Sequence, residues 1–217
     1  MPIQGLIDGY KRFCTRYFDE DPSLFAELAK KGQRPHAVVV ACSDSRVSPN
    51  VLFNTQPGEL FVVRNVANLV PPPGAKVGTA TLAGIEYGIL GLEVERIIVL
   101  GHSRCGGIRA LIEGPENTGE VFPHVTEWVS TFDPVRRATY GEPRRKYREK
   151  EARSLERAAL IQSYENLLAY PWVAEKVAAG DLELHAWYFR LAAGILETYD
   201  PASGRFNTLV GELETAS

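Results

Sequence analysis

Two short apolar runs, each followed by residues that commonly bind metals, constrain this chain more than any other feature. Residues 38–41 are three valines and an alanine, and Cys42 follows them. Residues 97–100 are equally apolar, with His102 and Cys105 close behind. Short β-branched runs of this kind are typical of buried strands in a parallel sheet. Because parallel strands end at one edge of a sheet, we expect both runs to deliver these side chains to one place.

The other predicted elements fit the same fold class. Helices are expected at residues 3–16, 22–31 and 106–112, and strands at 36–41, 60–63 and 96–100, with a strand hairpin at 182–199. Because strands and helices alternate, we expect an α/β fold with a central, mostly parallel sheet of four to five strands flanked by helices. The late hairpin would add an edge strand and make the sheet mixed.

Small residues gather between residues 78 and 90, where Ala80, Ala83, Gly84 and Gly88 lie in a stretch of helical length. A glycine inside a helix costs about 1 kcal/mol relative to alanine. Packing against a close neighbour must therefore hold this helix. We expect it to be buried or to lie at a contact between subunits.

Charge, hydropathy and cysteine content exclude several classes of protein. The net charge of −3 argues against a nucleic-acid-binding domain, which is usually basic. No apolar run approaches the roughly 18 residues of a membrane span, and no basic region precedes an apolar segment at the N-terminus. Three cysteines without an export signal favour reduced or metal-binding thiols. We expect a cytoplasmic protein that binds neither nucleic acid nor membrane.

Residues 142–157 carry charges of both signs. The basic residues are candidates for an anion-binding patch; they are Arg144, Arg145, Lys146 and Arg148. Glutamates are interleaved with them, however, and mixed signs along a helix are typical of a solvated face. We interpret this stretch as such a face.

Cys42, His102 and Cys105 are the candidate metal ligands. Alone, a histidine and a cysteine three residues apart also fit a buried pair, and a lone cysteine also fits a core. Together they form a set of two cysteines and one histidine. Three protein ligands with an open fourth position are the arrangement of a catalytic zinc site, and thiolate and imidazole suit zinc better than magnesium or calcium. We predict one zinc ion per subunit.

Asp44 and Arg46 would form the next layer of the site. Residues two apart share one side of an extended chain, so both side chains can converge with that of Cys42. A bidentate arginine keeps a carboxylate ionised, and an ionised carboxylate only accepts hydrogen bonds. Asp44 would then orient a zinc-bound hydroxide. Two alternatives remain open: a simple salt bridge in a loop, and Asp44 as a fourth ligand that closes the site.

The spacing Cys42-x-Asp44-x-Arg46 followed by His102-x-x-Cys105 resembles the β-class carbonic anhydrases. The resemblance includes residues 57–59, 64–68, 86–88 and 101–107, and more loosely 166–171. It implies that Cys42, His102 and Cys105 hold the zinc and that Asp44 and Arg46 are the catalytic dyad. The implied enzyme is a zinc lyase, carbonate dehydratase. It hydrates carbon dioxide reversibly to bicarbonate and a proton, through a zinc-bound hydroxide oriented by the dyad.

The resemblance also implies a substrate pocket of the plant-like, open subtype. Its residues here would be Gln33, Phe61, Val66, Tyr87 and Gly106. The other subtype carries a tryptophan three residues before the first cysteine, where this chain has Val39. We therefore expect Asp44 to pair with Arg46 and not with zinc. From residue type alone, Phe61, Val66 and Tyr87 fit an ordinary core better than a pocket.

In the β class part of the pocket comes from a neighbouring subunit. The resemblance thus implies a homodimer or an assembly of dimers, with N-terminal helices that extend to the partner. We expect a single domain over residues 1–217, with a helical arm at 1–34, a zinc-binding α/β core at 35–112, and C-terminal helices and edge strands at 113–217.

Other reactive side chains have no assigned role. Cys14 fits a packed thiol, and Arg104 fits a surface residue better than an anion guide. His36, His124 and His185 are candidates for carrying protons, as histidine often does, but the sequence alone does not place any of them relative to the metal.

Two other functions compete with the hydration of carbon dioxide. One is the hydrolysis of carbonyl sulfide or carbon disulfide on the same scaffold. The other is a structural or regulatory zinc protein whose site Asp44 closes. A thiol redox role has less support, because the chain has no C-x-x-C pair.

Overall fold

The computed structural model describes residues 2–143 and 149–211, and the chain divides into two compact units, 1–34 and 35–217. The N-terminal unit contains α1 (Ile3–Cys14), a π-helical segment (Thr15–Glu20) and α2 (Ser23–Lys31), close to the helices predicted there. Aromatic rings pack within this unit: the ring centroids of Phe13 and Phe18 lie 5.3 and 5.2 Å from that of Phe25. These contacts join α1 and α2.

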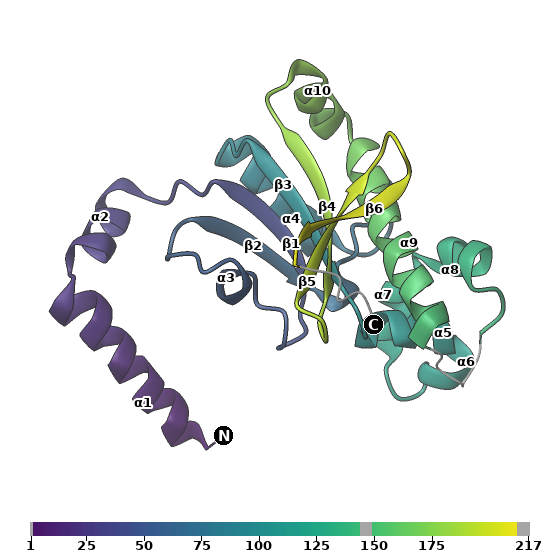
Figure 1. Ribbon diagram of the computed structural model, residues 1–217, viewed down its shortest axis with the longest axis horizontal. Coiled ribbons are helices and arrows are strands. Elements are labelled where there is room, and N and C mark those ends of the chain that lie inside the picture. Colours follow the sequence, from purple (N-terminus) through teal and green to yellow (C-terminus); the bar gives the residue numbers. More distant parts are fainter. Residues whose placement is uncertain (1, 144–148, 212–217) are drawn as a thin grey trace, which may run out of the picture. The chain divides into compact units, whose positions relative to one another are not determined.

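A six-stranded sheet forms the centre of the second unit (Figure 1). In spatial order its strands are β2 (Leu60–Asn65), β1 (Ala37–Cys42), β3 (Arg96–His102), β4 (Glu183–Arg190), β5 (Ile195–Asp200) and β6 (Arg205–Val210). The first four are parallel, and β5 and β6 continue the sheet in antiparallel pairing. The mostly parallel α/β fold is confirmed.

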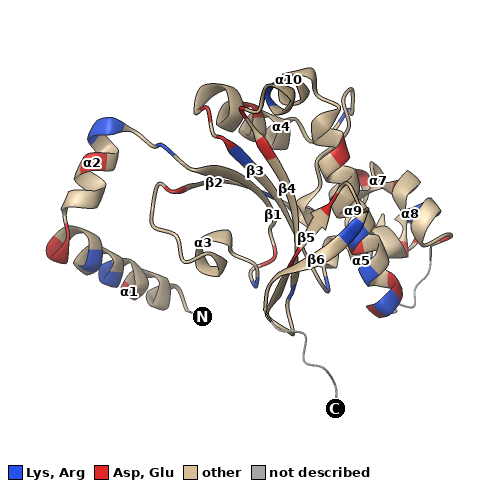
Figure 2. Cartoon of the chain, turned by 45° about the horizontal axis from the view of Figure 1, so that its top comes forward, with Lys and Arg blue, Asp and Glu red and all other residues tan. Residues whose placement is uncertain are grey.

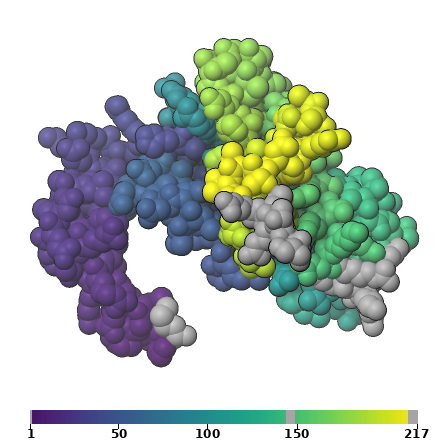
Figure 3. Space-filling model, viewed as in Figure 1, coloured from purple at the N-terminus to yellow at the C-terminus, as the bar shows by residue number. Residues whose placement is uncertain are grey.

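The sheet has one strand more than the four to five expected, because β6 was not predicted. Nearly all of its residues are exposed, and only Phe206 is half-buried. An edge strand of this kind lacks the alternation of apolar and polar residues that signals a half-buried strand. In Figure 3, β6 (yellow) lies at the surface of the molecule.

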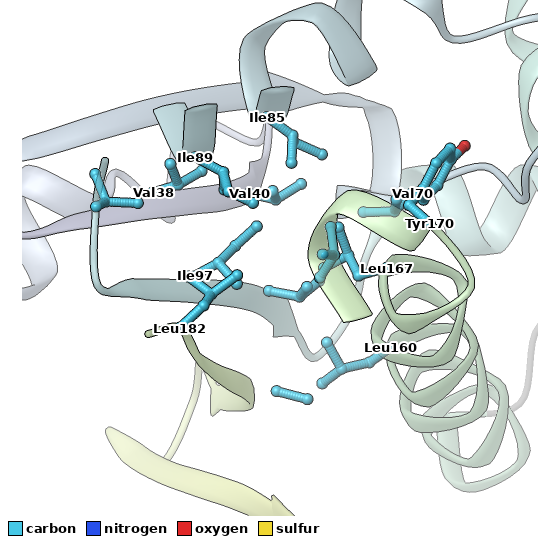
Figure 4. Packing of buried hydrophobic residues seen from close by; sticks show 14 of the residues in the cluster. Val38, Val40, Val70, Ile85, Ile89, Ile97, Leu160, Leu167, Tyr170 and Leu182 are labelled. Carbon is cyan, nitrogen blue, oxygen red and sulfur yellow. The ribbon is translucent and has the colours of Figure 1, made fainter. Parts of the chain in front are cut away.

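β1 is buried along its whole length, which explains its uninterrupted apolar sequence. On one face, Val38 and Val40 share a core with Ile85 and Ile89 (Figure 4). This core also includes residues of α9 (Glu149–Leu168) and α10 (Pro171–Ala179). On the other face, Val39 packs in a separate cluster against residues that include those around α3 (Pro49–Leu52). The sheet is thus covered on both faces beside the strand that carries Cys42.

The small residues of α4 (Thr79–Glu86) and the π-helical segment that follows it (Tyr87–Gly91) allow close packing on the sheet. A Cβ on Gly84 would lie 2.9 Å from Val63, and a Cβ on Gly88 would lie 2.3 Å from Val38. The prediction of a close neighbour for this helix is therefore confirmed. Within the chain, that neighbour is the sheet.

The remaining helices are α5 (Gly106–Glu113), α6 (Pro115–Thr118), α7 (Pro123–Ser130) and α8 (Asp133–Thr139). Of these, only α5 was predicted. Arg144, Arg145, Lys146 and Arg148 of the predicted charged face lie outside the described residues. Residues 149–157 open α9, where both charge signs alternate (Figure 2), but Glu156 is buried there, so the prediction of a solvated face is wrong at that position. Among the described residues, no helix combines the length and apolar character that spanning a membrane requires.

Candidate metal centre

The three predicted ligands converge at one edge of the sheet. Cys42 ends β1, His102 ends the neighbouring parallel strand β3, and Cys105 directly precedes α5. Their ligand atoms all lie within 4.8 Å of one another, and the two sulfurs are 3.9 Å apart. All three side chains are buried. The topology therefore assembles a compact set of two sulfur ligands and one nitrogen ligand.

The orientation of His102 indicates which of its nitrogens is available. Nδ1 lies 3.0 Å from the carbonyl oxygen of Ser103, which can only accept, so Nδ1 donates. In the neutral ring, Nε2 then carries a free lone pair. Nε2 is buried and has no hydrogen-bond partner among the described residues, although leaving such an atom unpaired is unfavourable. The residues thus fit a tetrahedral metal such as zinc, with three protein ligands.

The two thiols differ in how readily they lose a proton. The hydrogen bond with Cys105 lowers the pKa of Cys42 to about 4, and the same bond, together with burial, raises the pKa of Cys105. The backbone N–H of Ala67 also donates to Sγ of Cys42, over 3.4 Å. A thiolate is the form that binds a metal. One of the required thiolates is therefore already favoured near neutral pH.

Asp44 and Arg46 form the pair that their spacing predicted. Nε of Arg46 donates to Oδ1 of Asp44 over 2.9 Å, and Nη2 donates to Oδ2 over 2.6 Å. These bonds hold the pKa of Asp44 well below its usual value, so the group is ionised at neutral pH. Its side chain is only 15% exposed, and Oδ2 lies 4.0 Å from Nε2 of His102. The ionised carboxylate thus lies next to the ligand set.

Arg64 stabilises the backbone at Cys42 and Asp44 through hydrogen bonds. It lies near the end of β2, and its guanidinium donates to the carbonyl oxygen of Cys42 over 3.0 and 2.8 Å. It also donates to the carbonyl oxygen of Asp44 over 2.8 Å. Arg64 belongs to one of the motifs that carry the family resemblance, but the sequence analysis assigned it no role. Its contacts depend on the register between β1 and β2, which the sequence alone does not fix.

Glu156 is a residue of the site that sequence reasoning missed. It lies on α9, and its Oε1 accepts a hydrogen bond from the backbone N–H of Cys105 over 3.1 Å. Its Oε2 accepts from the hydroxyl of Tyr188 over 2.6 Å. Burial raises the pKa of Glu156. No local signal could have identified it, because the sequence around it is a run of mixed charges that suggests a solvent-exposed helix.

Val66 and the two glycines Gly106 and Gly107 lie beside the loop of residues 102–105, which carries His102 and Cys105 and is called the metal loop below. A Cβ on Gly107 would lie 2.6 Å from Cγ1 of Val66 and 2.8 Å from Cβ of Ala67, so only glycine fits there without displacement. A Cβ on Gly106 would meet no atom within 4 Å. Gly107 therefore allows α5 to approach the segment that contacts Cys42, a role not assigned from the sequence.

The structure places Phe61 and Tyr87 away from the metal ligands of the same chain. Phe61 pairs in register with Val38, four residues before Cys42 along β1. Four residues of a strand span about 13 Å. The Phe61 ring contacts that of Tyr87 at a centroid distance of 5.8 Å, and Tyr87 is 54% exposed. Gln33 belongs to the N-terminal unit and is exposed there.

The residues set aside earlier lie outside the ligand group. Cys14 is the last residue of α1. Arg104 is exposed and pairs with Glu149 at 3.1 Å, as expected of a surface residue. His185 lies on β4 with Nε2 at 3.3 Å from Glu183, and the side chains of His36 and His124 are exposed.

Comparison with known proteins gives one consistent result. The family model described as carbonic anhydrase matches residues 37–196. The carbonic anhydrase of Synechocystis sp. is 35% identical over 202 residues, which are 91% of this chain and 71% of that protein. Beta carbonic anhydrase 3 of Arabidopsis thaliana is 34% identical over 91% of this chain and 77% of its own length. Beta carbonic anhydrase 5, chloroplastic, of the same plant is 39% identical over 88% and 62%.

Solved structures agree with the sequence comparisons. The β-carbonic anhydrase CcaA matches with a TM-score of 0.87 at 33% identity, covering 95% of this chain and 98% of that one. A tetrameric β-carbonic anhydrase from Sordaria macrospora matches with a TM-score of 0.76 at 25% identity, over 95% and 96% of the two chains.

Proposed function

The chain belongs to the β class of the carbonic anhydrase family, and from this membership we propose that it is a zinc lyase, carbonate dehydratase. The reaction is the reversible hydration of carbon dioxide to bicarbonate and a proton. The observation that carries the proposal is the buried group of Cys42, His102 and Cys105, with the free lone pair of His102 Nε2 among its donors.

Cys42, His102 and Cys105 would hold one zinc ion per chain, with a fourth position open to solvent or substrate. When bound, zinc supplies a Lewis acid that produces a nucleophile from water near neutral pH. The thiolates and the imidazole would hold the ion in place, and the hydrogen bond from His102 to Ser103 fixes the ring for this task. The product proton leaves to solvent or buffer.

Asp44 orients the attacking water. Its carboxylate is ionised and only accepts hydrogen bonds, so it accepts one from the nucleophile. Arg46 donates three hydrogen bonds to the carboxylate, two of them to Oδ1 and one to Oδ2, so Oδ2 retains a lone pair on the side of His102. Arg46 fixes the plane of the carboxylate and so directs that lone pair of Oδ2 toward the nucleophile.

We assign the site to the open subtype, in which Asp44 stays off the metal. Its bidentate pairing with Arg46 competes with metal ligation, since rotating Asp44 onto zinc would break both bonds. Val39, in place of a tryptophan, supports the same assignment. A structural zinc protein closed by Asp44 is disfavoured for the same reasons.

The pocket requires a second copy of the chain. Val66 and Gly106 lie by the metal loop, whereas Phe61 lies about 13 Å away along the strands, with its ring against that of Tyr87. The exposed Tyr87 ring is available to a partner. A homodimer, or an assembly of dimers, would let one chain offer Phe61 and Tyr87 to the metal site of the other. Gln33 remains a predicted contributor.

A stopped-flow hydration assay, with a zinc analysis on the same sample, tests this function. The zinc-loaded chain should accelerate the hydration of carbon dioxide, and it should lose this activity when the zinc is removed. Parallel assays with carbonyl sulfide and carbon disulfide separate the competing hydrolase function. Faster turnover of either sulfur compound than of carbon dioxide would overturn the proposal.

A further inference from the structure

Glu156 reaches the metal loop from a helix that carries none of the ligands, and it is only 4% exposed. We infer that Glu156 is a positioning residue of the metal centre, which fixes the backbone that presents Cys105 and is itself oriented by Tyr188. The inference rests on the zinc site of the proposed function. α9 and β4 would then contribute to metal binding, although neither element carries a ligand.

The loop between the ligands His102 and Cys105 needs external support. Arg104 has a left-handed backbone with φ of 58°, a conformation that non-glycine residues rarely adopt and that persists where surrounding contacts enforce it. Ser103 supplies some of these contacts. Its N–H donates to the carbonyl oxygen of Phe189 over 3.0 Å, and its hydroxyl accepts from the N–H of Leu191 over 2.9 Å.

Glu156 supplies the support at Cys105 itself. The N–H of Cys105 donates to Oε1 of Glu156, and Cys105 is the residue before the first turn of α5. Without this acceptor the buried N–H would be unpaired, and the loop could relax away from its present path. The position of the Cys105 sulfur, 3.9 Å from that of Cys42, depends on this path.

Tyr188 holds the carboxylate in the orientation that Cys105 requires. Tyr188 is fully buried on β4, and its hydroxyl donates to Oε2 of Glu156 over 2.6 Å. The guanidinium of Arg157 lies over the Tyr188 ring, 5.1 Å from its centroid, and pairs with Glu197. A carboxylate in a buried position is expensive to keep unless its oxygens are used. Both oxygens of Glu156 are used, and one of them acts on a ligand residue.

The test measures how tightly zinc is held by the full-length, zinc-loaded protein. A chelator of known zinc affinity is titrated against the unchanged chain, Glu156→Ala and Glu156→Gln. The glutamine keeps an oxygen that can accept from the Cys105 N–H. We expect Glu156→Ala to weaken zinc binding about 10–100-fold, as is typical of residues that support metal ligands, and Glu156→Gln to bind nearly as tightly as the unchanged chain. Cobalt-substituted samples of each variant report the thiolate-to-metal absorption of the ligand set.

A matched control is Asp133→Asn. Asp133 pairs with the buried Arg136 on α8, and the substitution removes the carboxylate charge of that pair. It should leave zinc affinity and the cobalt spectrum unchanged. Should Glu156→Ala not fold, Tyr188→Phe carries the test, because it removes one of the two bonds that orient Glu156. It should weaken zinc binding measurably.

Three results would overturn the inference. Glu156→Ala could bind zinc as tightly as the unchanged chain, with an unaltered cobalt spectrum. Tyr188→Phe could show no change, where it carries the test. Asp133→Asn could weaken zinc binding as much as Glu156→Ala, which would indicate general loosening of the fold. An unchanged chain that holds no zinc at all would overturn the proposed function together with the inference.

Discussion

The guanidinium of Arg46 donates two hydrogen bonds to the carboxylate of Asp44. Oδ2, which accepts the shorter one at 2.6 Å, lies 4.0 Å from Nε2 of His102. An ionised, oriented carboxylate thus lies beside three buried ligand atoms. Charge-assisted bidentate pairing gives both strength and direction.

Replacing Arg46 by lysine should lower the rate of carbon dioxide hydration about 10–100-fold, in line with other residues that support metal-site groups. Lysine keeps the charge but cannot hold the carboxylate bidentately. Zinc content should stay the same, because Arg46 touches no ligand side chain. Stopped-flow rates and zinc analysis check both statements. Arg96→Lys, in an exposed pair with Glu183, is the control, and an equal loss of rate in that variant would contradict the explanation.

Two neighbouring glycines should respond differently to alanine. Gly107→Ala should lower the free energy of unfolding by about 1–3 kcal/mol, since its Cβ would overlap Val66 and Ala67. Gly106→Ala meets open space and should be neutral or stabilising by up to about 1 kcal/mol, because alanine favours the helix. Denaturant unfolding of the two zinc-loaded variants measures the difference. Equal stabilities would show that the close approach of α5 is not needed.

Removing zinc should lower the thermal stability of the protein as well as its activity. A ligand that binds only the folded state stabilises that state by mass action. Without the metal, the ligand atoms that converge at the strand ends lose their common partner. Thermal unfolding before and after chelation, with zinc or magnesium added back, measures this. Restoration by magnesium would contradict the assignment of a thiolate and imidazole site.

Two inactive variants should restore activity when their subunits mix. Asp44→Asn damages the metal site, and Tyr87→Ala damages the ring that a partner would offer to it. A mixed dimer contains one site in which both residues are intact. Random exchange of equal amounts should therefore recover about a quarter of the unmodified activity, as twofold symmetry dictates.

Light scattering on the same samples gives the oligomeric state. A dimer in which mixing restores nothing would contradict a shared pocket. A fully active monomer would contradict it as well.

The convergence of Cys42, His102 and Cys105 could be predicted from sequence because it depends on local features. Apolar runs mark β1 and β3, and parallel strands necessarily bring Cys42 and His102 to one edge. The two-residue spacing of Asp44 and Arg46 likewise suffices to pair them. The ligand identities follow from residue type.

Contacts between distant segments were not predictable. Glu156 acts on Cys105 from 51 residues away, and the placement of α9 over β3 and β4 decides that contact. Phe61 was assigned to the pocket by resemblance, but its distance from the metal depends on strand register. The edge strand β6 has almost no buried residues to mark it. In each case the information lies in tertiary packing.

Location in the cell stays a prediction.

The hydration rate of Asp44→Asn, compared with the unchanged chain at equal zinc content, tests the central claim most directly. Asparagine has the same shape, but it carries no charge and replaces one accepting oxygen by an amide group that donates. We expect one zinc ion per chain in both proteins and a loss of at least about 100-fold in the stopped-flow rate of the variant, as for the loss of a group that orients the reacting atoms. A variant that holds zinc and hydrates carbon dioxide within a few-fold of the unchanged chain would contradict the role of Asp44. An unchanged chain that holds zinc but does not accelerate hydration would contradict the proposed function.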